Sequence, residues 1–243
     1  MPWDFALILL FLAVAVPILG RRRIRQLMRT PKTTKRDRLA LYASTAIFQW
    51  IAAALILWRT HVHGIVPANL GIAIPNPLLS LAVSALLVGF VLANQLLALK
   101  RLALKPVDSQ GILAQMAAKV FPQDNAERLA FSALVVTVAI CEELIYRGFG
   151  QRVFQDVSGG LVAAGIFGSA ALFALAHLYQ GRRGLISTLI IGALFSGVRA
   201  WTASLIPLII AHFAMDLTAG FLAPARFRAI AASGGSPSRV ESS

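Results

Sequence analysis

The sequence predicts an all-α fold, a polytopic transmembrane helical bundle, and two observations carry that prediction. First, 58% of the 243 residues are hydrophobic and only 14% are charged, whereas a soluble domain carries about a quarter charged residues. Second, the charged residues cluster and leave apolar runs of about 20 residues, which is the length a helix needs to cross a bilayer. Helix is the expected state of these runs, because isolated strands cannot satisfy their backbone groups in lipid.

Seven apolar runs are long enough to be membrane spans, and together they account for most of the chain. Each is expected to form one helix of the bundle. In chain order they are residues 3–19, 39–58, 78–99, 129–149, 161–178, 185–201 and 204–222.

The segments outside the spans indicate how the chain is organised. No connection between spans is long enough to fold alone, so residues 1–223 are expected to form a single integral membrane domain. Residues 108–121 follow Pro106 and carry apolar side chains on one helical face, which indicates an additional interfacial helix. Residues 224–243 end in a Gly- and Ser-rich stretch and are predicted to be a disordered tail.

The basic residues indicate a membrane topology and not a nucleic-acid partner. Nine of the 23 lysines and arginines fall in residues 21–38, directly after the first apolar run. Such a cluster is typical of a cytoplasmic loop held at an anionic leaflet. With the amino terminus outside and the carboxyl terminus inside, 19 basic residues lie inside, and the four outside are Arg59, Arg147, Arg152 and Arg199.

The fourth predicted span contains adjacent acidic residues, Glu142 and Glu143, after a charge-free run. Ionisable side chains at such depth are costly and usually mark a functional cavity. Glu143 and Arg147 are spaced i, i+4 with the acid first, which favours an ion pair. Glu142 then lies about 100° around the helix as the freer carboxylate, able to act as a general base. The alternative interpretation of the same residues is a structural Glu–Arg clamp.

Two further spans carry polar side chains. His177 lies one helical turn beyond Phe173 near the end of the fifth span, where a lone histidine is usually interfacial. His212 and Asp216 form an i, i+4 pair inside the seventh span, which favours a functional interpretation. Polar sites on three nearby spans can satisfy one another only by converging. Cys141 adjoins them and is expected to pack as a small apolar residue, not to act as a nucleophile.

In chain order these motifs read EELIYR, FALAH and HFAMD, between residues 128 and 222. The pattern EExxxR, FxxxH and HxxxN or HxxxD on successive apolar segments resembles that of the CPBP family, also called Abi. These are CAAX-type and bacteriocin-processing intramembrane proteases. The resemblance implies a multi-pass protein of a prokaryotic cell membrane that hydrolyses a peptide bond of a peptide or protein substrate. The first three spans carry no part of the resemblance.

The resemblance also implies roles for individual residues. Glu142 would activate water with help from His177, and His212 and Asp216 would stabilise the oxyanion. Many family members have asparagine where this chain has Asp216. An ionised aspartate cannot donate a hydrogen bond, so Asp216 would have to be protonated or would have to orient His212.

In the same family pattern, Glu143 and Arg147 would support the first glutamate. A zinc mechanism is the alternative to glutamate catalysis, with Glu142, His177 and His212 as a His₂Glu ligand set and water in the fourth position. These ligands would come from three spans, so no local spacing indicates zinc. Catalysis without a cofactor is therefore favoured, and zinc stays open.

Other functions remain compatible with the sequence. Some relatives serve as membrane scaffolds or in bacteriocin immunity, and a transporter could use a Glu/His relay, although no inverted repeat is visible. The predicted topology raises a further question about depth. Seven spans place Glu142 in the outer half of the bilayer, whereas the resemblance implies access from the cytoplasm. A longer fourth helix would reconcile the two.

Overall fold

The structure is a computed structural model that describes residues 1–103 and 119–234. The predicted interfacial helix, residues 108–121, lies largely outside the described residues. Every long regular element in the described ranges is helical, in the following order: α1 (Trp3–Leu10), η1 (Phe11–Ala15), α2 (Val16–Arg29), α3 (Lys35–Val62), η2 (Pro67–Leu70), α4 (Pro77–Ala103), α6 (Asn125–Glu142), η4 (Glu143–Gly150), α7 (Gln151–Val157), α8 (Val162–Ala176), η5 (Leu178–Gln180), α9 (Gly181–Thr202) and α10 (Ile206–Gly234).

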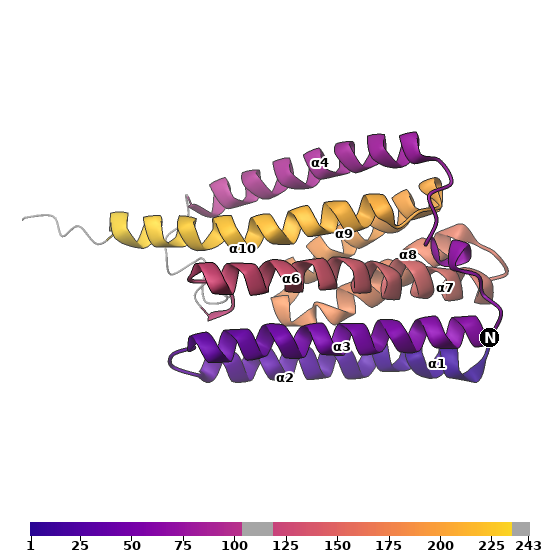
Figure 1. The fold of residues 1–243 in the computed structure, drawn as a ribbon, viewed down its shortest axis with the longest axis horizontal. Coiled ribbons are helices and arrows are strands. Elements are labelled where there is room, and N and C mark those ends of the chain that lie inside the picture. Colours follow the sequence, from indigo (N-terminus) through magenta and orange to yellow (C-terminus); the bar gives the residue numbers. More distant parts are fainter. Residues whose placement is uncertain (104–118, 235–243) are drawn as a thin grey trace, which may run out of the picture.

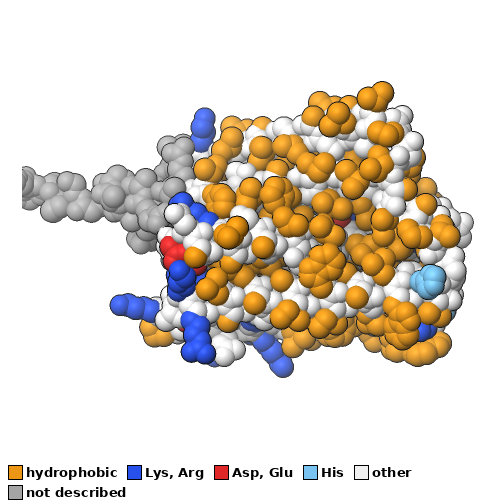
Figure 2. Space-filling model, viewed as in Figure 1, with side chains coloured by type: hydrophobic (Ala, Val, Ile, Leu, Met, Phe, Trp, Pro, Cys, Tyr) orange, Lys and Arg blue, Asp and Glu red, His pale blue; other side chains and the backbone are white. Residues whose placement is uncertain are grey.

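The helices confirm the predicted fold class. Five helical stretches of the described chain are long and apolar enough to cross a membrane, and two shorter apolar helices, Val162–Ala176 and Ile206–Leu222, accompany them. Figure 1 shows these helices running back and forth along one axis, with α6 inside the bundle and α4 at its edge beside α10. Hydrophobic side chains cover the flank of the bundle in Figure 2, as a surface in contact with lipid requires.

Lysine and arginine side chains gather at the end of the bundle where α2 turns into α3 (Figure 2). The sequence predicted a cytoplasmic loop over residues 21–38. In the structure most of this segment is helical, because α2 continues to Arg29 and α3 begins at Lys35, so that residues 30–34 form the connection. Arginine and lysine are good helix formers. A helix can therefore continue through these basic residues beyond the apolar part of the span. Thr34 and Asp37 form a capping box that starts α3.

The helix that carries the two glutamates is longer than the predicted span of residues 129–149. It runs without a break over Asn125–Val157, 33 residues, which is about 50 Å and exceeds the thickness of the hydrocarbon core. Its first 18 residues end at Glu142. Glu142 therefore lies near the middle of this helix. A fourth helix longer than the predicted span is the condition under which seven spans and access from the cytoplasm were expected to agree.

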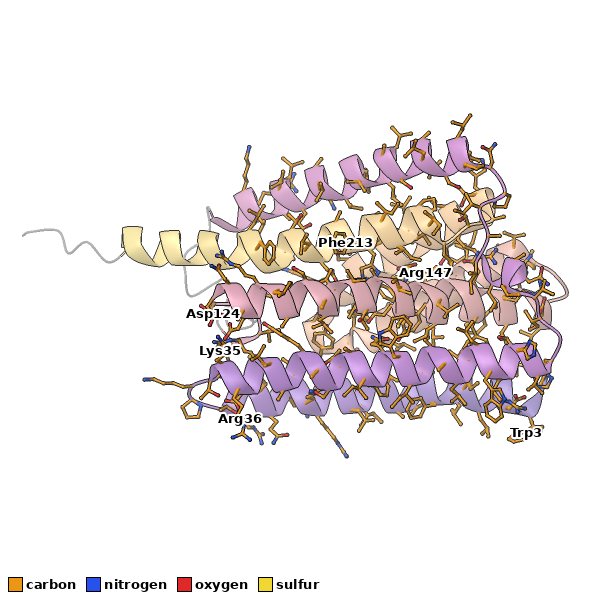
Figure 3. The ribbon with its side chains drawn as sticks, viewed as in Figure 1. Trp3, Lys35, Arg36, Asp124, Arg147 and Phe213 are labelled. Atoms are coloured by element: carbon orange, nitrogen blue, oxygen red, sulfur yellow. The ribbon has the colours of Figure 1, made fainter. Side chains whose placement is uncertain are left out.

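Two ion pairs at the basic end join α3 to the start of α6. Arg38 donates two hydrogen bonds to the buried carboxylate of Glu127, at 2.9 and 2.7 Å. Lys35 and Asp124, which are labelled side by side in Figure 3, form a more exposed pair at 2.7 Å. The Lys35 ammonium lowers the pKa of the Asp124 carboxyl. These contacts fix how α3 lies along α6.

Replacing Arg38 by methionine is expected to destabilise the protein, because Glu127 would stay buried as an unpaired charge. Breaking a buried pair in this way costs about 3–5 kcal/mol in the free energy of unfolding. Unfolding of the purified protein by dodecyl sulfate in mixed micelles measures it. Lys35→Met is the matched control, since it breaks the exposed pair and should change stability little. Equal stability of both variants would contradict the expectation.

Candidate active site

The glutamate pair lies where the helix changes its winding. The segment η4, Glu143–Gly150, is a π-helix, and all eight of its residues are buried. Short π segments within α-helices are rare and often occur at functional sites. Gly148 allows the η2 turn to come close, because a Cβ at this position would lie 3.0 Å from the carbonyl oxygen of Leu70. The winding thus turns successive side chains of the EELIYR motif into the bundle.

Glu143 and Arg147 form the buried centre of the site. Arg147 Nη1 donates to Glu143 Oε1 at 3.0 Å, and both side chains are fully buried. The structure therefore places together the i, i+4 pair that the sequence predicted. The guanidinium also lies over the ring of Phe173, 4.0 Å from its centroid, and 5.5 Å from the centroid of Phe195. These aromatic faces give the cation favourable contacts in place of water.

His212 joins this centre from α10. Its Nδ1 lies 2.7 Å from Glu143 Oε1, the same oxygen that accepts from Arg147. Its Nε2 lies 3.5 Å from Asp216 Oδ2 and 3.9 Å from Glu142 Oε2. Three carboxylates thus surround one imidazole and provide acceptors for both ring nitrogens. Holding Nδ1 against Glu143 directs Nε2 toward Glu142 and Asp216.

The two oxygens of Glu142 have different surroundings. Oε1 accepts a hydrogen bond of 2.8 Å from Gln49 Nε2 on α3. Oε2 is buried and has no hydrogen-bond partner among the described residues, and it faces His212 Nε2 at 3.9 Å. Glu142 is therefore held through one oxygen and has no hydrogen-bond partner at the other, whereas neighbouring Glu143 contacts both Arg147 and His212.

His177 follows the last residue of α8 and lies against the ring of Phe173. Its ring stacks at a tilt on the Phe173 ring with centroids 4.4 Å apart, and its Nδ1 lies 2.8 Å from the Phe173 carbonyl oxygen. A proton on Nδ1 would satisfy that carbonyl and leave Nε2 with a free lone pair. Within the described chain His177 makes no hydrogen bond to either glutamate. The Phe173 ring is thus the contact that places His177 beside the carboxylate cluster.

The structure therefore brings five of the six predicted site residues into direct contact and places His177 next to them. Sequence reasoning missed Gln49, although an amide inside the apolar run of residues 46–58 was a visible signal. It also missed that Glu143 binds His212, because that contact joins distant parts of the chain. Cys141 is fully buried in the hydrophobic core, among apolar side chains of neighbouring helices.

The geometry also bears on the zinc alternative. Among the described residues, no group of three or more His, Cys, Asp or Glu side chains lies in an arrangement that could hold a metal ion. A zinc site would require Glu142, His177 and His212 to converge at ligand distances of about 2 Å from one point. In the present arrangement these three side chains do not converge in that way.

The part of the chain that carries the site matches a known protein family. Residues 125–218 match the family described as type II CAAX prenyl endopeptidase Rce1-like. The match covers α6 through most of the apolar part of α10 and includes all six motif residues. The chain thus contains an Rce1-like domain of the CPBP (Abi) family, which confirms the resemblance noted from the motifs. No curated protein and no solved structure matched the chain.

Substituting each glutamate by glutamine is expected to separate their contributions to stability. Glu143→Gln leaves the buried Arg147 without a counter-charge and should lower the free energy of unfolding by about 3 kcal/mol or more. Glu142→Gln keeps a carbonyl oxygen for Gln49 and leaves Arg147 paired, so stability should change little. Dodecyl sulfate unfolding of both purified variants measures the difference. A Glu142→Gln variant that is the less stable of the two would contradict these assignments.

Proposed function

We propose that this protein is an intramembrane endopeptidase in which Glu142 activates the attacking water. The observation that supports the proposal most directly is the asymmetry of the Glu142 carboxylate, which is hydrogen-bonded at Oε1 and has no hydrogen-bond partner at Oε2, 3.9 Å from His212 Nε2. This arrangement lies near the middle of a long membrane helix and inside the Rce1-like domain. The family implies a peptide substrate, and the long apolar helices around the site support a reaction within the membrane.

In the first step, Glu142 Oε2 takes a proton from water as the water oxygen forms a bond to the carbonyl carbon of the scissile peptide. The π-electron pair of the carbonyl moves to its oxygen, which becomes an oxyanion. In the second step that pair returns, the C–N bond breaks, and Glu142 gives its proton to the leaving nitrogen. A carboxylic acid and an amine are released, and Glu142 ends as a carboxylate. Such a general base contributes about 10²–10⁴-fold to the rate.

His212 and His177 complete the catalytic group in this proposal. In its protonated form His212 carries an N–H on each ring nitrogen, so Nε2 would donate to the oxyanion while Nδ1 donates to Glu143 Oε1 at 2.7 Å. His177, with Nδ1 on the Phe173 carbonyl, would use Nε2 to orient the water for Glu142. Asp216 would act through His212, whose Nε2 is 3.5 Å away. This orienting role does not require a protonated aspartate to donate to the oxyanion.

The proposed substrate class is taken from the description of the matching family, type II CAAX prenyl endopeptidase. We propose that the protein cleaves peptides near a prenylated cysteine at the carboxyl terminus, and that the basic end of the bundle faces the cytoplasm. Glutamate catalysis without a metal is the favoured mechanism. Cell-membrane location and a prokaryotic origin complete the proposal.

The activity can be tested with the full chain reconstituted in liposomes. The probe is an internally quenched peptide that carries a farnesylated cysteine four residues from its carboxyl end, with the unprenylated peptide as its match. The wild-type protein should cleave the farnesylated peptide, and Glu142→Ala and His177→Ala should each lower the rate by about 100-fold or more. Both variants should insert and purify as the wild type does. Retained activity in either variant would refute its assigned role.

A test in cells does not depend on the choice of peptide. Mass spectrometry of membrane peptides should show cleavage products in cells that produce the wild type and should not show them with Glu142→Ala. If the two peptide sets are identical, and if the Ala variant preserves the cellular phenotype, the non-catalytic scaffold or bacteriocin-immunity function replaces the protease proposal.

A further inference from the structure

Gln49 contacts the site from outside the Rce1-like match of residues 125–218. It lies on α3, inside a run that is otherwise apolar from Ala46 to Trp58. An amide is costly to place in lipid unless it is hydrogen-bonded. Its Nε2 donates to Glu142 Oε1 at 2.8 Å. A carboxylate can only accept, which fixes the amide nitrogen as the atom that faces it.

Other contacts between α3 and α6 set the position of Gln49. The buried Arg38–Glu127 pair joins the two helices at the basic end. Next to Gln49, Trp50 Nε1 donates to Thr137 Oγ1 at 3.2 Å. Gln49 is therefore carried to Glu142 by a helix pairing that other residues already maintain. Its own hydrogen bond is not needed to hold the helices together.

We infer that Gln49 is a positioning residue for Glu142, holding Oε1 so that Oε2 stays turned toward His212 Nε2. The inference rests on the proposed function, because it concerns how the general base is aimed. Without this hydrogen bond, the Glu142 side chain could rotate about its terminal torsion, which is broad. The open oxygen would then spend less time where the water is activated.

The chemistry of an amide suits this task better than that of a cation. Lysine or arginine at this position would form an ion pair with Glu142 and would favour the carboxylate over the acid. Glutamine is neutral and can serve both forms. It donates from Nε2 to Oε1 of the carboxylate, and when Oε2 carries the proton, Oε1 is a carbonyl oxygen that still accepts the same hydrogen bond. Gln49 can thus hold Glu142 before and after the proton is taken from water.

The test is Gln49→Met, which keeps the length of the side chain and removes its hydrogen bonding. With the farnesylated quenched peptide and the full chain in liposomes, kcat should fall by about 10- to 100-fold, while KM stays within about twofold. The matched control is Trp50→Phe, which removes the neighbouring α3–α6 hydrogen bond and should leave kcat within about twofold. Similar losses of kcat in the two variants would mean that Gln49 only supports the fold, which overturns the inference.

Gln49→Glu is a second variant with a readout in pH. Its protonated side chain can donate to Glu142, whereas its ionised form would repel the carboxylate. Activity should therefore recover as the pH falls, relative to wild type at the same pH. A Gln49→Glu profile that parallels the wild type would overturn the inference, even if Gln49→Met failed to fold.

If Glu142→Ala is inactive and Gln49→Met has wild-type kcat, the inference fails and the proposed function stands. An active Glu142→Ala would show instead that the proposed function itself is wrong.

Discussion

The arrangement of the site depends on how the buried charge of Arg147 is neutralised. Its counter-ion, Glu143, offers one oxygen to both Arg147 and His212, at 3.0 and 2.7 Å. This shared oxygen links the EELIYR helix to α10 and sets the rotation of the imidazole. The orientation of His212 Nε2 toward Glu142 is therefore a consequence of an ion pair that takes no direct part in the proposed reaction. A buried charge pair of this kind specifies geometry more than it adds stability.

Two adjacent glutamates acquire opposite tasks because neighbouring helical positions face different partners. Glu143 points to the guanidinium of Arg147 and the imidazole of His212, and both of these groups are buried with it. Glu142 points toward α3, where it meets only a neutral amide. One carboxylate is thus fully occupied and the other keeps an oxygen available. Glu142 can therefore take up a proton while Glu143 stays ionised and continues to neutralise the buried charge of Arg147.

Much of this could be read from the sequence, and the exceptions share a physical cause. Apolar runs predicted the spans, and the i, i+4 spacings predicted the Glu143–Arg147 and His212–Asp216 contacts, since helical geometry alone determines them. Helix ends were misplaced because apolar runs report the lipid core, whereas α2 and the Glu142 helix continue beyond it. The Gln49–Glu142 and Glu143–His212 contacts could not be predicted, since they depend on how separate helices pack. The predicted catalytic roles remain proposals.

The pairing of α3 with α6 has a consequence for what counts as the working unit of this protein. The recognisable family segment begins at residue 125, yet two of its acidic side chains find their partners on a helix that comes earlier in the chain. Arg38 pairs with Glu127, and Gln49 contacts Glu142. Grafting the segment onto a different set of preceding helices would leave both carboxylates facing lipid or mismatched side chains. The matched segment and α3 therefore form one structural unit, in which a change on one side of either contact requires a compensating change on the other.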